Sequence, residues 1–324
     1  MTTRIIATGA YVPEQVITND DLSKIVDTSD EWIVKRTGIK ERHISLGDNT
    51  SAFAVKTAKQ LIEKAGVEIK KLDLIIVASV TADYATPSIA CIVQKEIGAS
   101  NAVAFDISAA CSGFMFALSI ADKYIKSGAY NNAMIIGAET LSKMVDWSDR
   151  STCVLFGDGA GGVYVEKSET GGIIKEEIGT KGEICGILTG GYTPCTNIFN
   201  KNEEKTDHLW YINMNGREVF KFATKSVVKS VEKVLEGSNI NIDEIKYVIP
   251  HQANARIVEI ISNKLKIPYE KFYINMDRYG NTSSASIPIA LNELNEKGLI
   301  ERGNKILMTG FGGGMTWATM LISW

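Results

Sequence analysis

The residue best placed for covalent chemistry in this sequence is Cys111, in the stretch FDISAACSGFMF at 105–116. The apolar, β-branched run before it predicts a strand, and the apolar segment after it predicts a buried helix. Cys111 is therefore expected at the start of a helix, where the helix dipole and free N–H groups favour a thiolate and lower its pKa. The small residues on both sides leave space for an acyl group, as a nucleophile that forms a thioester requires.

Cysteine also has a common role without chemistry, because it is among the residue types most often buried in a core. Cys91, in an apolar helical segment, and Cys153, in STCVLF, fit that role. For Cys111 the packing role stays open, and its position at a strand-to-helix junction is equally consistent with a reactive thiol.

Two polar residues of the second half of the chain are candidates to act on the same substrate. His251, in VIPHQANARI at 248–257, follows a predicted strand and precedes a predicted helix. Asn281, in YGNTSSASIPIAL at 279–291, leads into another predicted helix through small hydroxyl residues. A histidine can donate or accept a proton, and an amide NH₂ can donate to a developing oxyanion. Each also has a structural interpretation, as a buried histidine or as a helix N-cap.

A third feature is the run of three glycines, 312–314, in MTGFGGGMTW. Such a run allows a tight turn with backbone N–H groups that face a ligand. A phosphate loop is the alternative, but neither GxxxxGK[ST] nor GxGxxG occurs between a strand and a helix. The glycines of FGDGAGG at 156–162 fit a tight turn into a strand better than a nucleotide site.

The elements that must position these residues alternate between two kinds. Segments with helical spacing separate short apolar runs, so the chain is expected to be an α/β protein with mostly parallel sheets. The strand-like runs of the first half are 4–10, 74–80, 102–107, 132–138 and 161–167, and its clearest helical segments are 50–66 and 87–99.

The second half repeats this order at a constant offset. A shift of 173 residues carries the strand at 74–79 onto 247–252, and it carries Cys111 onto Ser284. The same shift carries 134–138 onto 307–311. We interpret the chain as two copies of one α/β unit, whose limits are 1–168 and 169–324.

A crevice is expected where the two halves meet, because strand ends and helix starts converge there. Cys111 of the first half and His251 and Asn281 of the second would face each other across it. The stretch 171–215 is richer in turn residues and has no clear period, so we interpret it as an insertion that lines some part of the molecule, which the sequence does not identify.

Composition excludes several classes of protein. The 324 residues carry a net charge of −3, so nucleic acid and anionic membrane surfaces are not expected partners. The apolar runs are too short to cross a bilayer, and the first residues do not resemble a signal peptide. Five cysteines without a CxxC pair indicate neither a disulfide framework nor a metal site. We therefore expect a cytoplasmic protein with reduced thiols and no metal.

Taken together and in order, these motifs resemble one family. Six motifs carry the resemblance. Three contain the candidate residues: DISAACSGF has Cys111, HQANARI has His251 and YGNTSSAS has Asn281. The others are GFGGG, DEWIVKRTGIKERH at 30–43 and VLFGDGAGG at 154–162. The set is similar to β-ketoacyl-acyl-carrier-protein synthase III, of the thiolase superfamily, from end to end. The resemblance implies the thiolase-like αβαβα layered fold and a homodimer. The Asn281 position distinguishes this type from the chain-elongating synthases, which pair their cysteine with two histidines.

The resemblance implies a ping-pong Claisen condensation that initiates fatty-acid synthesis. Cys111 would take an acyl group from acyl-coenzyme A, with an oxyanion hole made of its own N–H and that of Gly314. Malonyl-acyl-carrier protein would then lose CO₂, and His251 and Asn281 would donate to the enolate oxygen. Neutral donors suit an enolate, and loss of one such donor typically costs about 10²–10³ in rate. Coenzyme A enters as a thioester substrate, and no cofactor is implied.

Further residues carry over from the resemblance. Trp32, Arg36 and Arg150 would hold the adenine and phosphates of coenzyme A, for which the planar guanidinium is suited. Phe311 would wall the acyl pocket, and Thr86 would reach the pocket floor of the partner subunit. Many family members carry phenylalanine at the Thr86 position, so the threonine predicts tolerance for longer or branched starters than acetyl.

A basic stripe is visible from spacing alone. Basic residues recur every four positions in the predicted helix at 217–233, so neighbours share a face, although each step drifts about 40°. A solvated helix face is the ordinary interpretation. Since the implied carrier protein is strongly acidic, the stripe is also a predicted docking face. Its residues are Arg217, Lys221 and Lys225, with Lys229 and Lys233 further along and Arg256 at the rim.

Two alternatives remain beside this hypothesis. One is a related starter or acyl-transfer enzyme of a specialised pathway, which would keep Cys111 and the fold. The other is a non-catalytic protein or nucleotide binder with the same fold, which would have no need of cysteine, histidine and asparagine at one crevice. A hydroxymethylglutaryl-type synthase is disfavoured because the sequence near Cys111 offers no comparable glutamate base.

Overall fold

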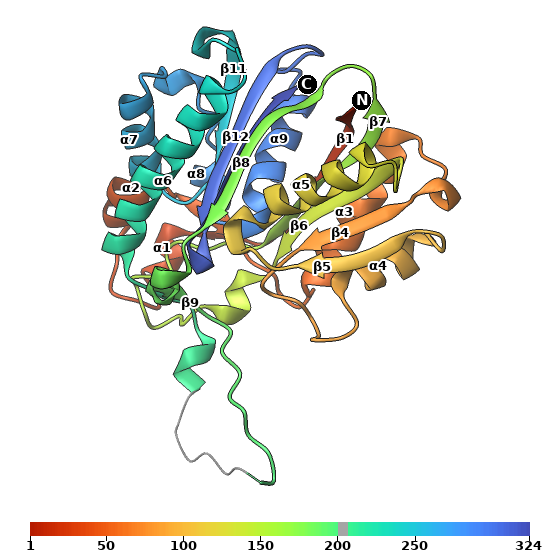
Figure 1. Ribbon diagram of the computed structural model, residues 1–324. Helices are drawn as coiled ribbons and strands as arrows, with labels where there is room; N and C mark the ends of the chain where they lie inside the picture. The colour runs from red at the N-terminus through yellow and green to blue at the C-terminus, as the bar shows by residue number, and fades with distance from the viewer. Residues whose placement is uncertain (200–206) are drawn as a thin grey trace.

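The computed structural model describes residues 1–199 and 207–324. It has five layers, in which two sheets are separated by two central helices and covered by helices on their outer faces (Figure 1). The predicted αβαβα arrangement is therefore confirmed. No helix within the described residues is both long and apolar enough to cross a bilayer.

The first sheet contains only strands of the N-terminal half, in the order β1-β7-β6-β4-β5. Its parallel centre reflects crossover helices between strands. β7 runs antiparallel to this centre, and the edge strand β1 pairs antiparallel with β7, so β1 has the direction of the centre. β5 is an edge strand, so within residues 1–199 and 207–324 no strand pairs with one side of its backbone. The strands are β1 (Thr2–Tyr11), β4 (Leu74–Ala78), β5 (Val103–Ile107), β6 (Asn132–Glu139) and β7 (Gly159–Ser168).

The second sheet repeats the first four strands in order and direction. Its order is β8-β13-β12-β11, with β11 parallel to β12 and the other pairs antiparallel. Where the first sheet has β5, the second has only a parallel bridge between Val248 and Phe272. Two copies of one unit would give this arrangement. The strands are β8 (Gly172–Thr180), β11 (Ile245–Pro250), β12 (Lys305–Gly312) and β13 (Thr316–Ser323).

The offset of 173 residues also has a local counterpart in the backbone. Short 3₁₀ turns, η2 (Ala110–Ser112) and η8 (Ser283–Ala285), precede the two central helices. Ala110 and Ser283, which the offset relates, both have positive φ, at 46° and 49°. Left-handed backbone is uncommon outside glycine, so its occurrence at both positions marks equivalent turns.

The central helices are α5 (Gly113–Lys126) and α9 (Ser286–Glu296). α5 packs between β4 and β6 of one sheet and β13 and β8 of the other, and α9 packs between β7, β1 and β11. Their side chains form one core with apolar residues of both sheets. This location explains why the segment after Cys111 is apolar almost all round, as predicted.

The outer layers cover one sheet each (Figure 1). α3 (Thr50–Ala65) and α4 (Ile89–Ile97) pack on the first sheet, and α6 (Gly216–Glu236) and α7 (Ala255–Leu265) pack together beside the second. The remaining α-helices are α1 (Asn19–Leu22), α2 (Asp30–Thr37) and α8 (Met276–Tyr279), and the remaining strands pair as β2 (Val16–Thr18) with β3 (Glu41–His43) and β9 (Leu188–Thr189) with β10 (Asn213–Met214). The other 3₁₀ turns are η1 (Ile69–Lys71), η3 (Leu141–Met144), η4 (Gly182–Ile187), η5 (Asp207–Trp210), η6 (Ile242–Glu244), η7 (Tyr269–Lys271) and η9 (Gly313–Met315).

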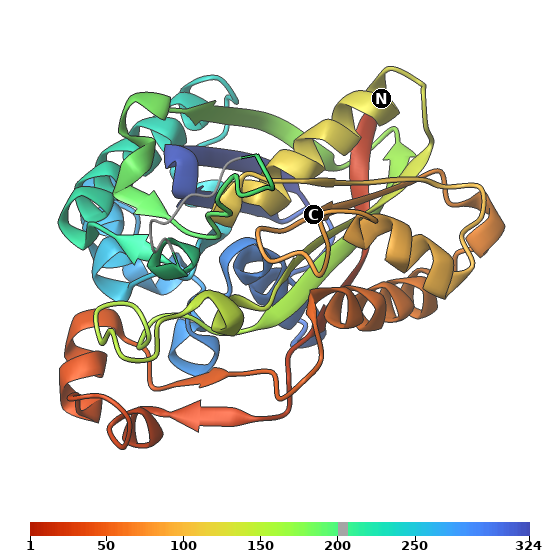
Figure 2. The same ribbon diagram turned by 90° about the horizontal axis from the view of Figure 1, so that it is seen from below.

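The segment at 16–43 leaves the N-terminal half and lies beneath the C-terminal half (Figure 2). There α2 packs on α7, and β3 packs on α8. This excursion carries the predicted coenzyme A residues of the first half to helices of the second half.

The close packing of the two halves generates a prediction at Gly137 of β6. A Cβ at this position would lie 2.3 Å from the carbonyl oxygen of Ser284 in η8, so the turn approaches the strand without room for a side chain. Gly137→Ala should lower the free energy of unfolding by about 1–3 kcal/mol or more, as overpacking of a core does.

Chemical denaturation of the variant beside wild type measures this loss. The matched control is Gly216→Ala at the start of α6, where the nearest atom to a new Cβ is Met214 Cε at 3.9 Å. An equal midpoint for Gly137→Ala and wild type would contradict the assigned approach of the halves.

Candidate active site

A cavity of about 450 Å³ lies where the two halves meet, and Cys111 is in its wall. Both halves contribute to the lining, as predicted, and so does the insertion at 171–215. The lining is mostly apolar, which suits an acyl chain. The lining residues are Val80, Ser108, Ala109, Ala110, Cys111, Leu141, Met144, Phe156, Cys185, Leu188, Thr189, Gly190, Ile212, Ser283, Gly313, Gly314 and Thr316.

Cys111 lies in the turn η2, between the end of β5 and the first residue of α5. The predicted strand-to-helix position is therefore correct. The end of β12 reaches this turn closely, because a Cβ on Gly312 would lie 2.6 Å from the Cys111 nitrogen. A residue with a side chain would cover that N–H group, so the glycine keeps it open to a ligand.

The electrostatic setting of Cys111 differs from the prediction. Burial raises its pKa to about 12, a hydrogen bond from Ser283 acts in the opposite direction, and the nearby Glu139 carboxylate raises the pKa further. The expected lowering of the pKa at a helix start is therefore wrong for the free site. Burial among protein atoms penalises the thiolate more than the helix start stabilises it.

Glu139, at the end of β6, is fully buried behind Cys111. One carboxylate oxygen accepts from the hydroxyls of Ser283 and Ser284, at 3.1 and 2.9 Å. The other accepts from Thr81 Oγ1 at 2.6 Å and, on the same loop, from Ser79 Oγ and the Val80 N–H at 3.2 and 3.1 Å. Burial raises the pKa of this carboxyl, and the hydrogen bonds lower it in part. The sequence analysis missed this residue, because its partners lie far away in the chain.

His251 follows β11 and is 4% exposed. Its Nδ1 lies 2.7 Å from Ser286 Oγ, and that hydroxyl also accepts from the Gln252 N–H at 3.4 Å. In the tautomer in which Nδ1 accepts the serine proton, the imidazole proton lies on Nε2, where it can be donated to a ligand.

Burial lowers the pKa of His251 to about 3, so the ring is neutral at physiological pH. Its edge packs against the Phe311 ring, with centroids 5.4 Å apart and planes at 75°. A neutral, fixed donor of this kind stabilises a developing enolate without first protonating it.

Asn281 is 7% exposed and lies between α8 and η8. Its backbone forms an isolated β-bridge with Phe156. The Asn281 N–H donates to Leu155 O at 2.8 Å, and the Asn281 carbonyl oxygen accepts from the Gly157 N–H at 3.0 Å. Its amide oxygen accepts from the Ser283 N–H at 2.9 Å. This bond fixes the amide orientation and leaves the NH₂ group to donate to a ligand.

The three predicted residues are brought together by β12 and η8. On one face of β12, a Cβ on Gly310 would lie 3.2 Å from His251 Cβ, and Gly312, two residues on, abuts Cys111. Alternate residues of a strand share a face and lie roughly 7 Å apart. Asn281 is linked to Cys111 through Ser283. The Ser283 N–H donates to the Asn281 amide oxygen, and the Ser283 side chain is hydrogen-bonded to the Cys111 sulfur.

Gly314 lines the cavity in the turn η9, with φ of 71°. This turn follows β12 directly, so the glycine run forms the tight turn that the sequence predicts, and it continues into a strand. The oxyanion hole predicted from the N–H groups of Cys111 and Gly314 stays a prediction.

The predicted coenzyme A residues form one cluster at the surface. The Arg36 guanidinium lies 4.2 Å from the centre of the Trp32 ring, and that of Arg150 lies 5.2 Å from it. Arg150 also binds Asp27 by an ion pair of 3.1 Å. The Asn254 side chain donates to Arg36 O at 3.0 Å and caps α7. An arginine pair on an indole face provides both stacking and phosphate-binding groups.

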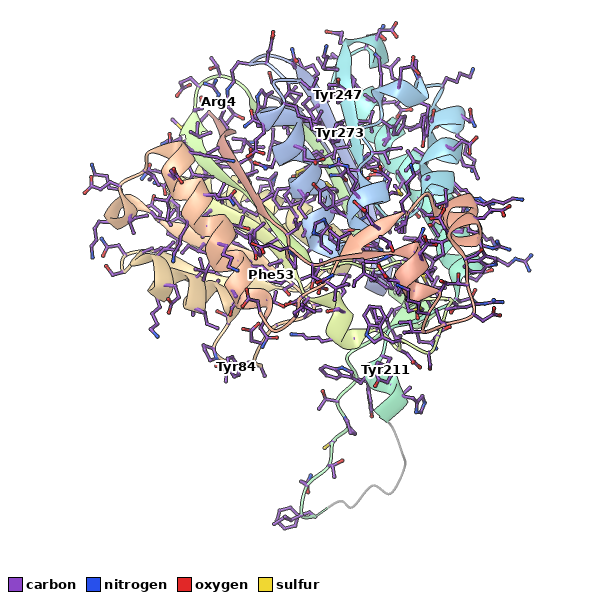
Figure 3. The ribbon with its side chains drawn as sticks, turned by 180° about the vertical axis from the view of Figure 1, so that it is seen from behind. Arg4, Phe53, Tyr84, Tyr211, Tyr247 and Tyr273 are labelled. Carbon is purple, nitrogen blue, oxygen red and sulfur yellow. The ribbon has the colours of Figure 1, made fainter. Side chains whose placement is uncertain are left out.

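Two predicted acyl-pocket residues do not line the cavity of this chain. Phe311 instead packs on His251, so it supports the imidazole rather than the acyl wall. Thr86 lies in an exposed loop, in a cis peptide bond with Pro87. Tyr84 of the same loop is 62% exposed and projects from the molecule in Figure 3. The wall is made by residues that the sequence analysis did not single out, such as Leu141 and Met144.

The basic stripe lies on the exposed face of α6. Lys221 and Lys225 line a groove of about 550 Å³ together with Lys229 and Lys233, so these four share a face, and Arg217 is exposed one turn earlier. The groove floor contains Phe222 and Trp317, and Glu177 pairs with Lys233 at 3.0 Å. Arg256 is exposed at the start of α7, the helix on which α2 packs.

Comparison with known proteins gives a consistent result. Residues 105–182 match the family described as 3-oxoacyl-[acyl-carrier-protein (ACP)] synthase III, and residues 235–324 match its C-terminal region. The chain is similar to the β-ketoacyl-[acyl-carrier-protein] synthase III of Clostridium acetobutylicum, with 53% identity over 99% of this chain and 98% of that protein.

Solved structures agree with this. The 3-oxoacyl-[acyl-carrier-protein] synthase III of Aquifex aeolicus VF5 is 48% identical, with a TM-score of 0.93 over 99% of this chain and 100% of that chain. The priming β-ketosynthase of the R1128 polyketide pathway is 32% identical, with a TM-score of 0.92 over 99% of this chain and 96% of that chain.

The raised pKa of Cys111 predicts how the thiol reacts with iodoacetamide. Since only the thiolate reacts, the rate of alkylation at Cys111 should keep rising through pH 7 to 10, by close to tenfold for each pH unit. Peptide mass spectrometry separates Cys111 from the exposed thiol of Cys185, which is the internal control. A rate at Cys111 that levels off below pH 8 would show that the pKa is not raised.

Proposed function

The chain belongs to the 3-oxoacyl-[acyl-carrier-protein] synthase III family and is a condensing acyltransferase, and from this premise we propose how its residues carry out the reaction. The family performs the decarboxylative Claisen condensation that initiates fatty-acid synthesis, using an acyl-coenzyme A and malonyl-acyl-carrier protein. We assign a role to each residue of the crevice in the order of the reaction.

In the first half-reaction, Trp32, Arg36 and Arg150 hold coenzyme A, and Cys111 attacks the acyl carbonyl. A sulfur–carbon bond forms at Cys111, the bond to coenzyme A breaks, and the thiol proton leaves with the released coenzyme A. The oxyanion accepts hydrogen bonds from the backbone N–H groups of Cys111 and Gly314. Because burial opposes the free thiolate, the negative charge is best tolerated once it has moved to that oxygen.

In the second half-reaction, malonyl-carrier protein occupies the side of the crevice formed by His251 and Asn281. The carbon–carbon bond to the malonyl carboxylate breaks, CO₂ leaves, and the electron pair forms an enolate. The enolate oxygen accepts hydrogen bonds from His251 Nε2–H and from the Asn281 amide NH₂. The enolate carbon attacks the acyl group on Cys111. The sulfur then leaves as a thiolate, which takes up a proton, and the 3-oxoacyl product stays on the carrier protein.

The observation that carries this proposal is the orientation of the two donors. Ser286 Oγ forms a hydrogen bond with Nδ1 of His251, and the Ser283 N–H donates to the amide oxygen of Asn281. The Nε2–H of His251 and the NH₂ of Asn281 are thereby left to donate to a ligand. The burial that keeps His251 neutral also excludes water from the enolate. A general base would instead need a free ring nitrogen as acceptor.

The carrier protein is proposed to dock on α6. Lys221 and Lys225 are exposed there, and Arg256 lies on the neighbouring helix α7, which packs on α2 and so adjoins the coenzyme A cluster. A basic face of this kind would steer an acidic carrier protein toward the entrance by charge complementarity.

A homodimer formed at β5 accords with the exposed edge of the first sheet. Val103 of β5 is 47% exposed, and in the part of the chain that the structure describes no strand pairs with the free edge of β5. Pairing of two copies there would cover the edge and would bring Thr86 of one subunit toward the pocket of the other. The cytoplasmic location stays a prediction.

The specialised-pathway alternative has the R1128 priming enzyme as its structural parallel, at 32% identity. The relatives at 48% and 53% identity are named 3-oxoacyl- and β-ketoacyl-[acyl-carrier-protein] synthase III, and these favour the initiating role. Turnover with malonyl-carrier protein separates the two functions.

The acylation step predicts a covalent intermediate. Incubation with acetyl-, propionyl-, butyryl- and branched acyl-coenzyme A should add one acyl mass to the protein, and Cys111→Ala should abolish it. Intact-protein mass spectrometry measures the adduct, and Cys185→Ala controls for reaction at the other thiol of the cavity wall. No adduct from any short acyl donor, or an adduct that persists in Cys111→Ala, would refute the assigned nucleophile.

The docking proposal predicts a selective effect of charge reversal. Lys221→Glu with Lys225→Glu should raise the KM for malonyl-carrier protein by roughly tenfold while acyl transfer from coenzyme A stays within about twofold, because only one substrate carries the acidic surface. Lys59→Glu with Lys70→Glu, two exposed lysines of the N-terminal half, gives the matched change in net charge. Equal loss in both half-reactions would exclude α6 as the docking face.

A further inference from the structure

The two proposed enolate donors are on separate segments of the chain, yet both segments rest on α9. The first residue of α9 is Ser286, which holds His251. Asn281 ends the segment 273–281, and side chains of this segment reach Glu293, about two turns further along the same helix. The helix is therefore a common support for both donors.

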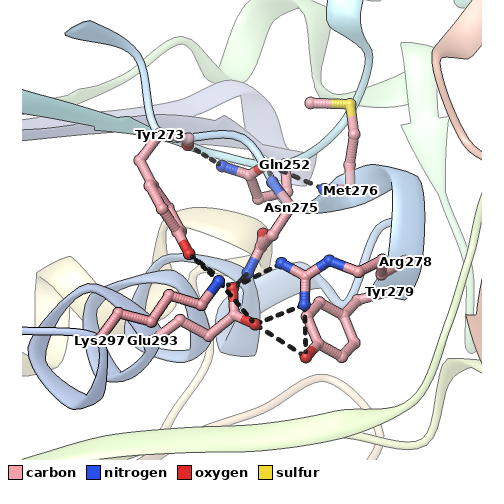
Figure 4. A network of polar contacts seen from close by, with 8 residues as sticks. All are labelled: Gln252, Tyr273, Asn275, Met276, Arg278, Tyr279, Glu293 and Lys297. Atoms are coloured by element: carbon pink, nitrogen blue, oxygen red, sulfur yellow. Dashed lines mark hydrogen bonds and ion pairs between the residues drawn. The ribbon is translucent and has the colours of Figure 1, made fainter. Parts of the chain in front are cut away.

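Glu293 is the acceptor for four side chains of that segment (Figure 4). Arg278 donates from both terminal nitrogens, at 2.6 and 2.9 Å. Asn275 Nδ2 donates at 2.9 Å, and the hydroxyls of Tyr273 and Tyr279 donate at 3.1 and 2.9 Å. These five bonds exceed the roughly four lone-pair sites of a carboxylate, so the segment saturates Glu293.

Gln252, the residue after the proposed histidine, ties the same segment to the end of β11 (Figure 4). Its Nε2 donates to Pro250 O at 2.8 Å and to Tyr273 O at 3.1 Å. Its Oε1 accepts from the N–H groups of Asn275 and Met276, at 3.0 and 3.2 Å. Gln252 is 1% exposed, so its amide uses all of these bonds inside the protein.

Burial alone would raise the pKa of Glu293, but the hydrogen bonds from Arg278 and Asn275 and the charge of Arg278 outweigh it and lower the pKa to about 2. The carboxylate is therefore ionised wherever the enzyme is folded and active. Charge-assisted bidentate bonds are directional, so they fix α8 relative to α9 more tightly than apolar packing would.

We propose that Glu293 is a positioning residue, which, through Arg278 and Gln252, sets the spacing of the two enolate donors. The proposal rests on the roles assigned to His251 and Asn281 above. It makes decarboxylation depend on Glu293 and leaves acyl transfer to the cysteine independent of it.

The separation of the two half-reactions follows from the contacts. The acyl oxyanion would be held by N–H groups of η2 and η9, and within the described residues no hydrogen bond of Glu293 reaches either turn. The enolate oxygen must meet two donors at once, and a shift of about 1 Å in one of them can cost about 10²-fold in rate.

The experiment measures both half-reactions in Glu293→Gln, which keeps the side-chain shape and removes the charge. Conversion of malonyl- to acetyl- and 3-oxoacyl-carrier protein should show kcat lowered by about 10- to 100-fold, with KM for the carrier protein within about twofold. Rapid-quench mass spectrometry should show acylation of Cys111 within about twofold of wild type.

Tyr279→Phe is the second variant, since it removes one donor to Glu293 and leaves the ion pair in place. It should give the same pattern with a smaller loss, about threefold, and it keeps the test decisive if Glu293→Gln does not fold. The matched control is Glu176→Gln. The Glu176 side chain is 17% exposed, against 12% for Glu293. Like Glu293 it accepts from a basic side chain, here Lys123, and from a neutral donor, here Ser119.

The outcomes are distinct. Slower decarboxylation with unchanged acylation in Glu293→Gln, but not in Glu176→Gln, supports the proposal. Equal loss in both half-reactions, or no loss in either, overturns it, because Glu293 would then serve stability alone or nothing measurable. If wild-type protein neither decarboxylates nor condenses malonyl-carrier protein, the proposed function fails instead.

Discussion

The buried carboxylate of Glu139 is the interaction on which the arrangement of the crevice depends. It is fully buried, and a charge in that position is tolerable only when hydrogen bonds replace water. Those bonds come from the loop at 79–81 of one half and from Ser283 and Ser284 of the other. The two halves are thereby joined beside Cys111, and the turn that orients Asn281 is held against the nucleophile.

The three reacting groups beside this junction carry little charge. Burial keeps the Cys111 thiol protonated and the His251 ring neutral, and Asn281 offers an amide, which carries no charge. Such a site gains most from negative charge on the substrate oxygens, where fixed N–H donors can meet it. Glu139 is buried, whereas the charged groups proposed to meet anionic substrates lie outside the cavity, at the Trp32 cluster and on α6, where water solvates them.

Much of this was predictable from local sequence. The strand-to-helix junction at Cys111, the strand before His251 and the glycine turn at 312–314 depend on residues close in the chain, and the structure has all three. Alternation and the offset of 173 residues, which relates Ala110 to Ser283, predicted two copies of one α/β unit, and the αβαβα layers were implied by the family resemblance. The supports were not predictable, because Ser286 and Glu293 are ordinary helix residues until their distant partners are known.

The sequence by itself determined which groups could react and in which elements they lie, since periodicity and turn residues act over short range. The tertiary structure alone decided three further things. It raised the pKa of Cys111, where the helix start had predicted a lower one, because burial is a property of the assembled halves. It placed Phe311 against His251 rather than in the acyl wall. It also brought Ser286 Oγ to 2.7 Å from Nδ1 of His251, a contact made only when α9 packs against the end of β11.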